Sequence, residues 1–154
     1  MAEELGIEGR SDLLRQIIGA PSNKIQQQSN GDIGANIASG SYPSDAMVVI
    51  PCSMGTLGRI AHGYGEDVLL RAADVMLKER KKLILVPRET PLSLVHVKNF
   101  ELLLLAGATL IPANPSFYTR PATIEQVVDT VVARVLDHLG IPQKLMPRWR
   151  EEQD

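Results

Sequence analysis

The sequence predicts an α/β protein, a three-layer, doubly wound parallel sheet with helices on both faces. Short apolar runs alternate along the chain with longer segments that have helical periodicity. Because a helix separates each apolar run from the next, consecutive strands are expected to be joined by right-handed crossovers and to lie parallel. A chain of 154 residues that is 44% apolar is long enough to enclose one such core.

Three apolar runs are expected to form the strands, at residues 46–51, 82–86 and 108–112. The first, AMVVIP, and the second, KLILV, are continuous rather than alternating, which is typical of strands covered on both faces. The third, around TLIPA, is short. In such a sheet, ligands bind outside the carboxyl ends of the strands.

Helices are predicted at residues 66–79, 93–107 and 123–140, and shorter ones after the N-cap candidates Ser11 and Ser53. Residues 93–107 are apolar nearly all round, which predicts deep packing. The last helix carries an apolar stripe at i, i+3, i+4 spacing, formed by Ile124, Val127, Val128, Val131, Val132, Val135, Leu136 and Leu139.

The chain divides into a lead-in of residues 1–31, one α/β domain at residues 32–141, and a tail at residues 142–154. The lead-in contains the short helix at residues 11–18, and a polar loop rich in Gly, Ser, Asn and Gln runs from residue 19 to residue 32, where the domain begins. A short helical turn is expected next, in DIGANIAS.

Composition excludes several classes of function. One cysteine, Cys52, allows no internal disulfide and no multi-cysteine zinc site, and the three histidines lack metal-ligand spacing, so we expect no metal. A net charge of -2 without a basic block argues against nucleic acid. No apolar run approaches the roughly 18 residues of a membrane span, and the start of the chain lacks a signal peptide, so we expect a cytoplasmic protein.

Chemically useful side chains follow each predicted strand. The turn CSMGT opens a helix, where free backbone N–H groups, two hydroxyls and the helix dipole suit a phosphate, although plain N-capping by Ser53 explains it equally. Cys52 is more simply a buried thiol than a nucleophile, because no histidine stands at a fixed local offset. The second and third strands lead to Arg88, Glu89, Phe117, Tyr118 and Arg120, which we expect to converge with this turn.

The charged residues of two predicted helices are open to more than one interpretation. Arg71, Asp74 and Lys78 share a sector with Asp67, and their i, i+4 acid-before-base spacing is typical of a solvated salt-bridge ladder. Arg134 lies at the edge of the last apolar stripe, from which it can extend to solvent or into a cleft.

Four stretches of the chain form a specific combination: IASGSYPSDAMVVIPCSMGTL, LLRAADVMLKERKKLILVPRETPLS, NPSFYTRP and VVARVLDHLGI. Together they closely resemble the UbiX-type flavin prenyltransferases of the flavoprotein superfamily, and the resemblance runs from about Asp32 to Ile141. It implies a Rossmann-like flavoprotein fold and transfer of a dimethylallyl group from dimethylallyl monophosphate to reduced FMN, without a metal. It also implies a homo-oligomer, a dodecamer built from trimers, and a UbiD-type decarboxylase that uses the prenylated FMN.

The resemblance also implies a role for individual residues. Residues implied to bind FMN are Ser53, Met54, Gly55, Thr56 and Arg88. Those implied to surround the donor phosphate are Arg71, Lys78, Glu89, Tyr118 and Arg134. Among them Glu89 would transfer protons, and Arg71 and Lys78 would stabilise the departing phosphate.

The amino-terminal part of the chain departs from the family pattern. Residues 1–31 lack the first strand and the Gly-rich GASG-type turn that follows it in the family, so the chain resembles an amino-terminally truncated member. Two hypotheses follow: a prenyltransferase whose missing segment comes from elsewhere, or a non-catalytic remnant that binds flavin or assembles with complete subunits. A flavin-dependent cysteine decarboxylase fits less well, because its Asn- and Met-rich substrate signature is missing.

Overall fold

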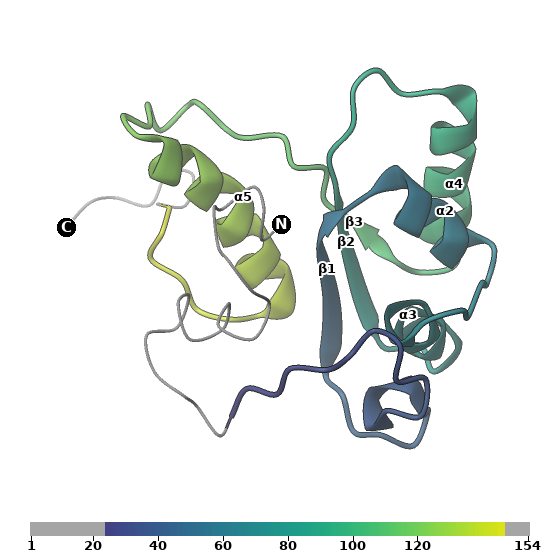
Figure 1. Cartoon of the computed structure of the whole chain (residues 1–154). Helices are drawn as coiled ribbons and strands as arrows, with labels where there is room; N and C mark the ends of the chain where they lie inside the picture. The colour runs from purple at the N-terminus through teal and green to yellow at the C-terminus, as the bar shows by residue number, and fades with distance from the viewer. Residues whose placement is uncertain (1–23, 147–154) are drawn as a thin grey trace.

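The described part of the chain forms a three-stranded parallel sheet with helices on both faces. The computed structural model describes residues 24–146, and the helix predicted at residues 11–18 lies outside them. Strands β1 (Ala46–Cys52), β2 (Lys82–Pro87) and β3 (Thr109–Leu110) lie in the order β1-β2-β3. Figure 1 shows α5 on one face of the sheet and α2, α3 and α4 on the other. The predicted fold class is confirmed.

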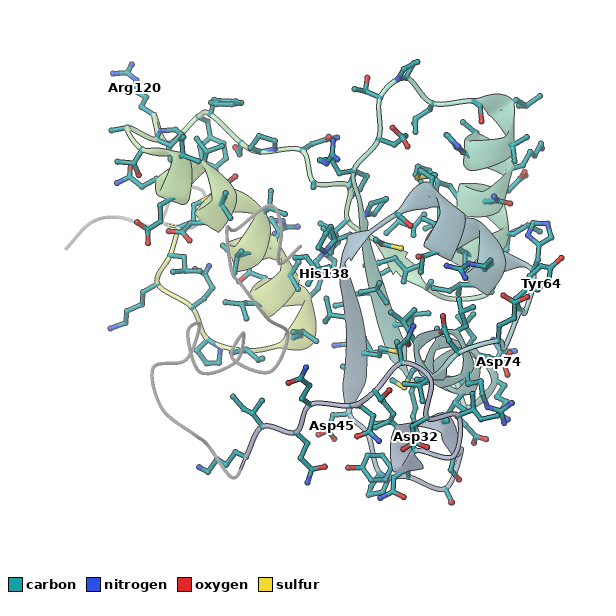
Figure 2. The ribbon with its side chains drawn as sticks, in the orientation of Figure 1. Asp32, Asp45, Tyr64, Asp74, Arg120 and His138 are labelled. Atoms are coloured by element: carbon teal, nitrogen blue, oxygen red, sulfur yellow. The ribbon has the colours of Figure 1, made fainter. Side chains whose placement is uncertain are left out.

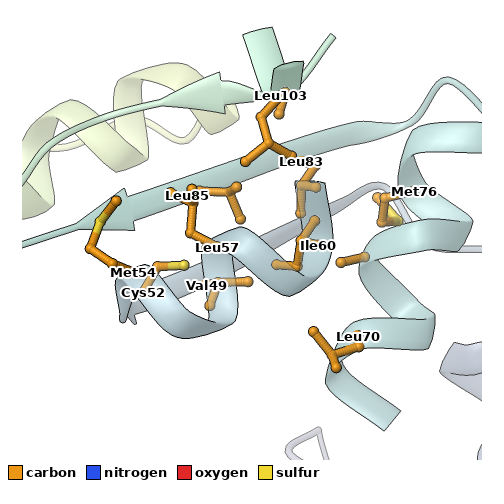
Figure 3. Packing of buried hydrophobic residues seen from close by; sticks show 12 residues of the cluster. Val49, Cys52, Met54, Leu57, Ile60, Leu70, Met76, Leu83, Leu85 and Leu103 are labelled. Carbon is orange, nitrogen blue, oxygen red and sulfur yellow. The ribbon is translucent and has the colours of Figure 1, made fainter. Parts of the chain in front are cut away.

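The central strand β2 carries both halves of the core. Leu83 and Leu85 point into the cluster formed with α2, α3 and α4 (Figure 3), whereas Ile84 and Val86 pack toward α5, and all four are at most 1% exposed. By contrast, Ile50 on β1 is 47% exposed, because β1 is the edge strand among the described residues. Coverage on both faces is thus confirmed for β2 but was wrong for part of β1.

Strand β3 is shorter than predicted, although the chain continues to pair with β2 beyond it. The Ile111 N–H donates to the Leu85 carbonyl at 2.9 Å, and the Ala113 N–H donates to the Pro87 carbonyl at 2.8 Å. Pro112, between them, has no N–H group to contribute. The chain therefore leaves the sheet at Asn114, level with the end of β2.

The helices begin at residues whose side chains cap them. They are α2 (Met54–Ala61), capped by Ser53; α3 (Val68–Lys78), capped by Asp67; α4 (Leu94–Leu105), capped by Ser93; and α5 (Ile124–Leu139), capped by Thr123. A 3-10 turn, η2 (Asn36–Ala38), lies in the predicted DIGANIAS segment and has no side-chain cap. Short polar side chains satisfy first-turn N–H groups wherever they precede a helix, so these starts were predictable to within two residues.

Helix α4 is not deeply packed, contrary to the prediction. Its buried residues are Asn99 and Leu103, while Leu94 is 73% exposed and Leu105 is 78% exposed. One side of α4 packs on α2 and β3, its principal neighbours among the described elements. Helix α5 shows the same effect at its start, where Ile124 is 84% exposed. Residues 24–146 of a single copy therefore leave a large apolar surface exposed.

Candidate active site

The carboxyl ends of β1 and β2 bring Ser53 and Arg88 to the same edge of the sheet. Cys52 and Pro87 are partners in the parallel register, and Ser53 and Arg88 each follow one of these partners directly. Because Ala113 also bonds to Pro87, the segment that begins at Asn114 leaves from this edge as well. The predicted grouping of the strand ends is confirmed for these positions.

The turn at Ser53 has the geometry of an anion-binding helix start. Ser53 Oγ accepts a hydrogen bond from the Thr56 N–H at 3.1 Å and lies 3.0 Å from Thr56 Oγ1. Ser53 and Gly55 are exposed, and no described group accepts a hydrogen bond from the N–H groups of Met54 and Gly55. The Met54 side chain is only 7% exposed and belongs to the core. A ligand can therefore meet the backbone of Met54 but not its side chain.

Arg88 and Glu89 are exposed beside this turn. Glu89 Oε1 accepts a hydrogen bond from the Thr90 N–H at 3.1 Å, and no described group donates to its other carboxylate oxygen. Within residues 24–146 the Arg88 guanidinium has no ion-pair partner. The strand edge thus offers unpaired N–H groups, a hydroxyl, a cation and a carboxylate, which fit a phosphorylated flavin and an anionic second ligand.

Arg71 and Lys78 lie elsewhere, on the outer face of α3. With Asp74, Gly63 and other residues they line a cavity of about 180 Å³, and Figure 2 shows Asp74 at the margin of the molecule, on the same side as Tyr64. Asp67 does not pair with Arg71, because it caps α3 by accepting from the Leu70 N–H at 2.8 Å.

The predicted salt-bridge ladder on α3 is wrong. Among the ion pairs of the described chain, none joins Asp67 to Arg71 or Asp74 to Lys78. The two cations are exposed and remain available to an anion.

Tyr118 and Arg134 line a larger cavity, of about 710 Å³, between the loop after β3, helix α5 and residues 140–146. The Ser116 N–H donates to Thr130 Oγ1 at 3.0 Å, and this hydroxyl donates to the Val127 carbonyl at 2.7 Å, so the loop is fixed to α5. Arg134 therefore extends to a cavity, while its side chain stays 56% exposed.

Arg120 does not join the strand ends. Figure 2 places it at the outer tip of the loop before α5, far from the sheet, so the predicted convergence was wrong for this residue. Sequence reasoning also missed Asp137 and Gln143, which line the cavity with Tyr118 and Arg134. Asp137 follows Arg134 by three residues on α5, and that spacing was the available signal.

Cys52 is an unreactive core residue. It is 1% exposed, and burial raises the pKa of its thiol from 9.0 to about 11. Its Sγ lies 3.7 Å from the Ser53 carbonyl oxygen. A thiol that stays protonated at neutral pH is a poor nucleophile, which agrees with the interpretation favoured from the sequence.

In the part of the chain that the structure describes, no three His, Cys, Asp or Glu side chains gather in a metal-binding group. Within residues 24–146, no helix is both long enough and apolar enough to cross a bilayer.

Comparison with known proteins identifies the family. The chain belongs to the Flavoprotein family, whose profile matches residues 11–136. Within it, the chain belongs to the UbiX-type flavin prenyltransferases. It is 45% identical over 154 residues to the flavin prenyltransferase UbiX of Halalkalibacterium halodurans, covering 99% of this chain and 75% of that protein. The match begins earlier than the resemblance noted from about Asp32.

Solved structures agree. AnUbiX (PadA1), crystallised in complex with FMN and dimethylallyl pyrophosphate, superposes with a TM-score of 0.78 at 43% identity, covering 80% of this chain and 66% of that one. A dodecameric FMN-dependent Ubix-like decarboxylase from Escherichia coli O157:H7 gives a TM-score of 0.76 at 48% identity, covering 79% of this chain and 65% of that one. The chain thus spans about two thirds of the length of these structures.

Proposed function

We propose that this chain is a flavin prenyltransferase subunit that transfers the dimethylallyl group of dimethylallyl monophosphate to reduced FMN. The observation that carries the proposal is the exposed helix start at Ser53 beside Arg88, on paired strand ends; Arg88 has no ion-pair partner among residues 24–146. A 43% identical structure, AnUbiX, holds FMN and dimethylallyl pyrophosphate. The reduced flavin supplies the nucleophilic carbon and nitrogen atoms, and the side chains of the protein bind, orient and transfer protons.

The residues at the strand edge have distinct proposed roles. The backbone and hydroxyls of residues 53–56 and the Arg88 guanidinium hold FMN through hydrogen bonds and opposite charge. Glu89, adjacent to Arg88, accepts and returns protons as the phosphate departs. Arg71, Lys78, Tyr118 and Arg134 bind the donor phosphate, and the first two stabilise the charge that develops on it.

The arrangement of the four donor residues supports a homo-oligomer. Arg71 and Lys78 line one cavity, and Tyr118 and Arg134 line another that shares no described residue with it. One phosphate can contact all four side chains if the Tyr118 and Arg134 cavity of one copy lies beside the Arg71 and Lys78 cavity of another copy. The exposed apolar residues of α4 supply a surface for such assembly, and the relative from Escherichia coli O157:H7 is dodecameric. A trimer-based dodecamer, a cytoplasmic location and a UbiD-type decarboxylase that uses the product complete the proposal.

Calorimetric titration with FMN tests the flavin site. Arg88→Ala removes a charged hydrogen-bond donor, so its Kd for FMN should rise about 10- to 100-fold. The matched control is Arg59→Ala, because Arg59 is an exposed arginine on α2 whose only described ion pair is with Glu66, at 3.9 Å. No FMN binding by the assembled wild-type chain would contradict the proposal and favour a non-catalytic remnant.

The reaction itself is tested anaerobically, with reduced FMN and dimethylallyl monophosphate, by mass spectrometry of the flavin. We expect the present chain to form little product by itself, and to form it when fused or mixed with an amino-terminal segment carrying the Gly-rich turn. Glu89→Gln should lower turnover much more than FMN affinity, because it removes the ionisable group but keeps the shape. No prenylated product from the fused or mixed protein would refute the assignment.

A further inference from the structure

Residues 140–146 form one wall of the Tyr118 and Arg134 cavity. Helix α5 ends at Gly140, whose φ of 76° is a left-handed conformation that glycine adopts without strain. The next residue turns back, with the Ile141 N–H donating to the Leu136 carbonyl at 3.0 Å. The segment therefore returns along the side of α5 that carries Arg134.

Gln143 holds this wall together. Its Oε1 accepts hydrogen bonds from the N–H groups of Leu145 at 2.8 Å and Met146 at 3.1 Å. Its Nε2 lies 3.4 Å from the Met146 carbonyl oxygen and donates to Asp137 Oδ1 at 3.3 Å. One side chain thus closes the local turn and also attaches it to α5.

Asp137 extends the connection to Arg134. Its second oxygen, Oδ2, lies 3.5 Å from Arg134 Nη1. At the other end, the Tyr118 hydroxyl lies 3.9 Å from Met146 Sδ. The network therefore reaches both side chains that the proposed function assigns to the donor phosphate, and it touches neither Ser53 nor Arg88.

We propose that Gln143 and Asp137 are positioning residues for the donor phosphate. This inference rests on the proposed function. A half-exposed arginine samples many rotamers, and binding a phosphate requires one of them. The Asp137 carboxylate, itself held by Gln143, restricts Arg134 before the donor arrives, and the wall keeps Tyr118 beside it. Such restriction of one or two side chains increases affinity about threefold to tenfold.

The test measures the Kd of the assembled chain for dimethylallyl monophosphate, inorganic phosphate and FMN by calorimetry. Gln143→Ala should raise the Kd for both phosphates about threefold to tenfold and leave that for FMN unchanged. Gln28→Ala is the matched control, because Gln28 also donates from Nε2 to a carboxylate, Asp32 Oδ2, at 3.3 Å, in the amino-terminal segment. If Gln143→Ala does not fold, Gln143→Met keeps the side-chain length without the hydrogen bonds.

Asp137→Asn separates positioning from simple charge. Removing a negative charge from an anion site should by itself tighten phosphate binding, whereas loss of positioning weakens it; we expect weaker binding. Glu125→Gln removes the same charge from the first turn of α5, about 18 Å away along the helix. It should leave the Kd for dimethylallyl monophosphate and the Kd for inorganic phosphate unchanged.

Three outcomes would overturn the inference. One is an unchanged Kd for dimethylallyl monophosphate in folded Gln143→Ala, and another is an equal loss of FMN affinity. Tighter phosphate binding by Asp137→Asn would also overturn it. If the wild-type chain binds FMN but no donor, the proposed function falls together with the inference; donor binding that is equal in wild type and Gln143→Ala defeats the inference alone.

Discussion

Replacing Ser53 by aspartate separates helix capping from ligand binding, because aspartate caps a helix as well as serine does but carries a negative charge. Ser53→Ala removes the acceptor of the Thr56 N–H, now at 3.1 Å. Loss of an N-cap costs about 1 kcal/mol of unfolding free energy. With a urea dependence of about 2 kcal/mol per molar, the unfolding midpoint should fall by about 0.5 M. Ser53→Asp should unfold at nearly the wild-type midpoint.

FMN binding should respond in the opposite way. If the turn holds an anionic flavin, a carboxylate at position 53 lies near the ligand charge. Two unit charges about 4 Å apart repel by roughly 4 kcal/mol at an effective dielectric constant of 20, and half of that after screening is still about 30-fold in Kd. Ser53→Asp is therefore expected to be stable but to bind FMN at least about tenfold more weakly.

The assay combines urea unfolding, followed by circular dichroism, with calorimetric titration of FMN. Thr123 is the matched control, because its hydroxyl caps α5 by accepting from the Gln126 N–H at the same distance, 3.1 Å. Thr123→Ala and Thr123→Asp should reproduce the stability pattern without the loss of FMN. Wild-type FMN affinity in Ser53→Asp would refute the reasoning and leave Ser53 as a cap alone.

Three further predictions concern other parts of the molecule. Arg71→Ala and Lys78→Ala should each raise the Kd for dimethylallyl monophosphate about tenfold by calorimetry, because each removes a charge that opposes the phosphate; an equal loss of FMN affinity would contradict their assignment. Leu105→Arg, at a position 78% exposed in one chain, should lower the mass measured by light scattering, and a wild-type mass near 16.8 kDa at micromolar concentration would disprove self-association. Burial raises the pKa of the Cys52 thiol from 9.0 to about 11 in the folded protein. Between these two pH values only the unfolded chain loses the proton, so the free energy of unfolding should fall by up to about 3 kcal/mol as pH rises. Urea unfolding midpoints of Cys52→Ala should lack this part of the decline.

Much of the fold could be predicted because it depends on short-range patterns. A continuous apolar run such as KLILV predicts a strand covered on both faces, and β2 is covered in this way from Leu83 to Pro87. Ser53 was identified as an N-cap from its place before a helix, because capping needs only a short polar side chain and the following N–H groups. Parallel crossovers then placed Ser53 and Arg88 at one edge of the sheet, as their paired neighbours Cys52 and Pro87 show.

Other features could not be predicted, because they depend on what lies opposite a side chain. The spacing of Asp67 and Arg71 indicated an ion pair, but the Asp67 carboxylate instead accepts a hydrogen bond from the Leu70 N–H and caps α3. An apolar helix predicts burial only if neighbours cover every face, and α4 has such neighbours on one side. Arg120 shares a short loop with Tyr118, yet it lies at the tip of that loop, away from the sheet (Figure 2).

By itself, the sequence determined the order of strands and helices along the chain, the Ser53 cap, the family and the residues proposed for the flavin edge, since each follows from local pattern or motif. Only the tertiary structure decided that Arg71 with Lys78 and Tyr118 with Arg134 occupy two separate cavities. It also decided that Gln143 and Asp137 connect the carboxyl-terminal wall to Arg134. Hydrogen bonds of this kind depend on the turn at Gly140 and on side-chain rotamers, which residue spacing does not determine.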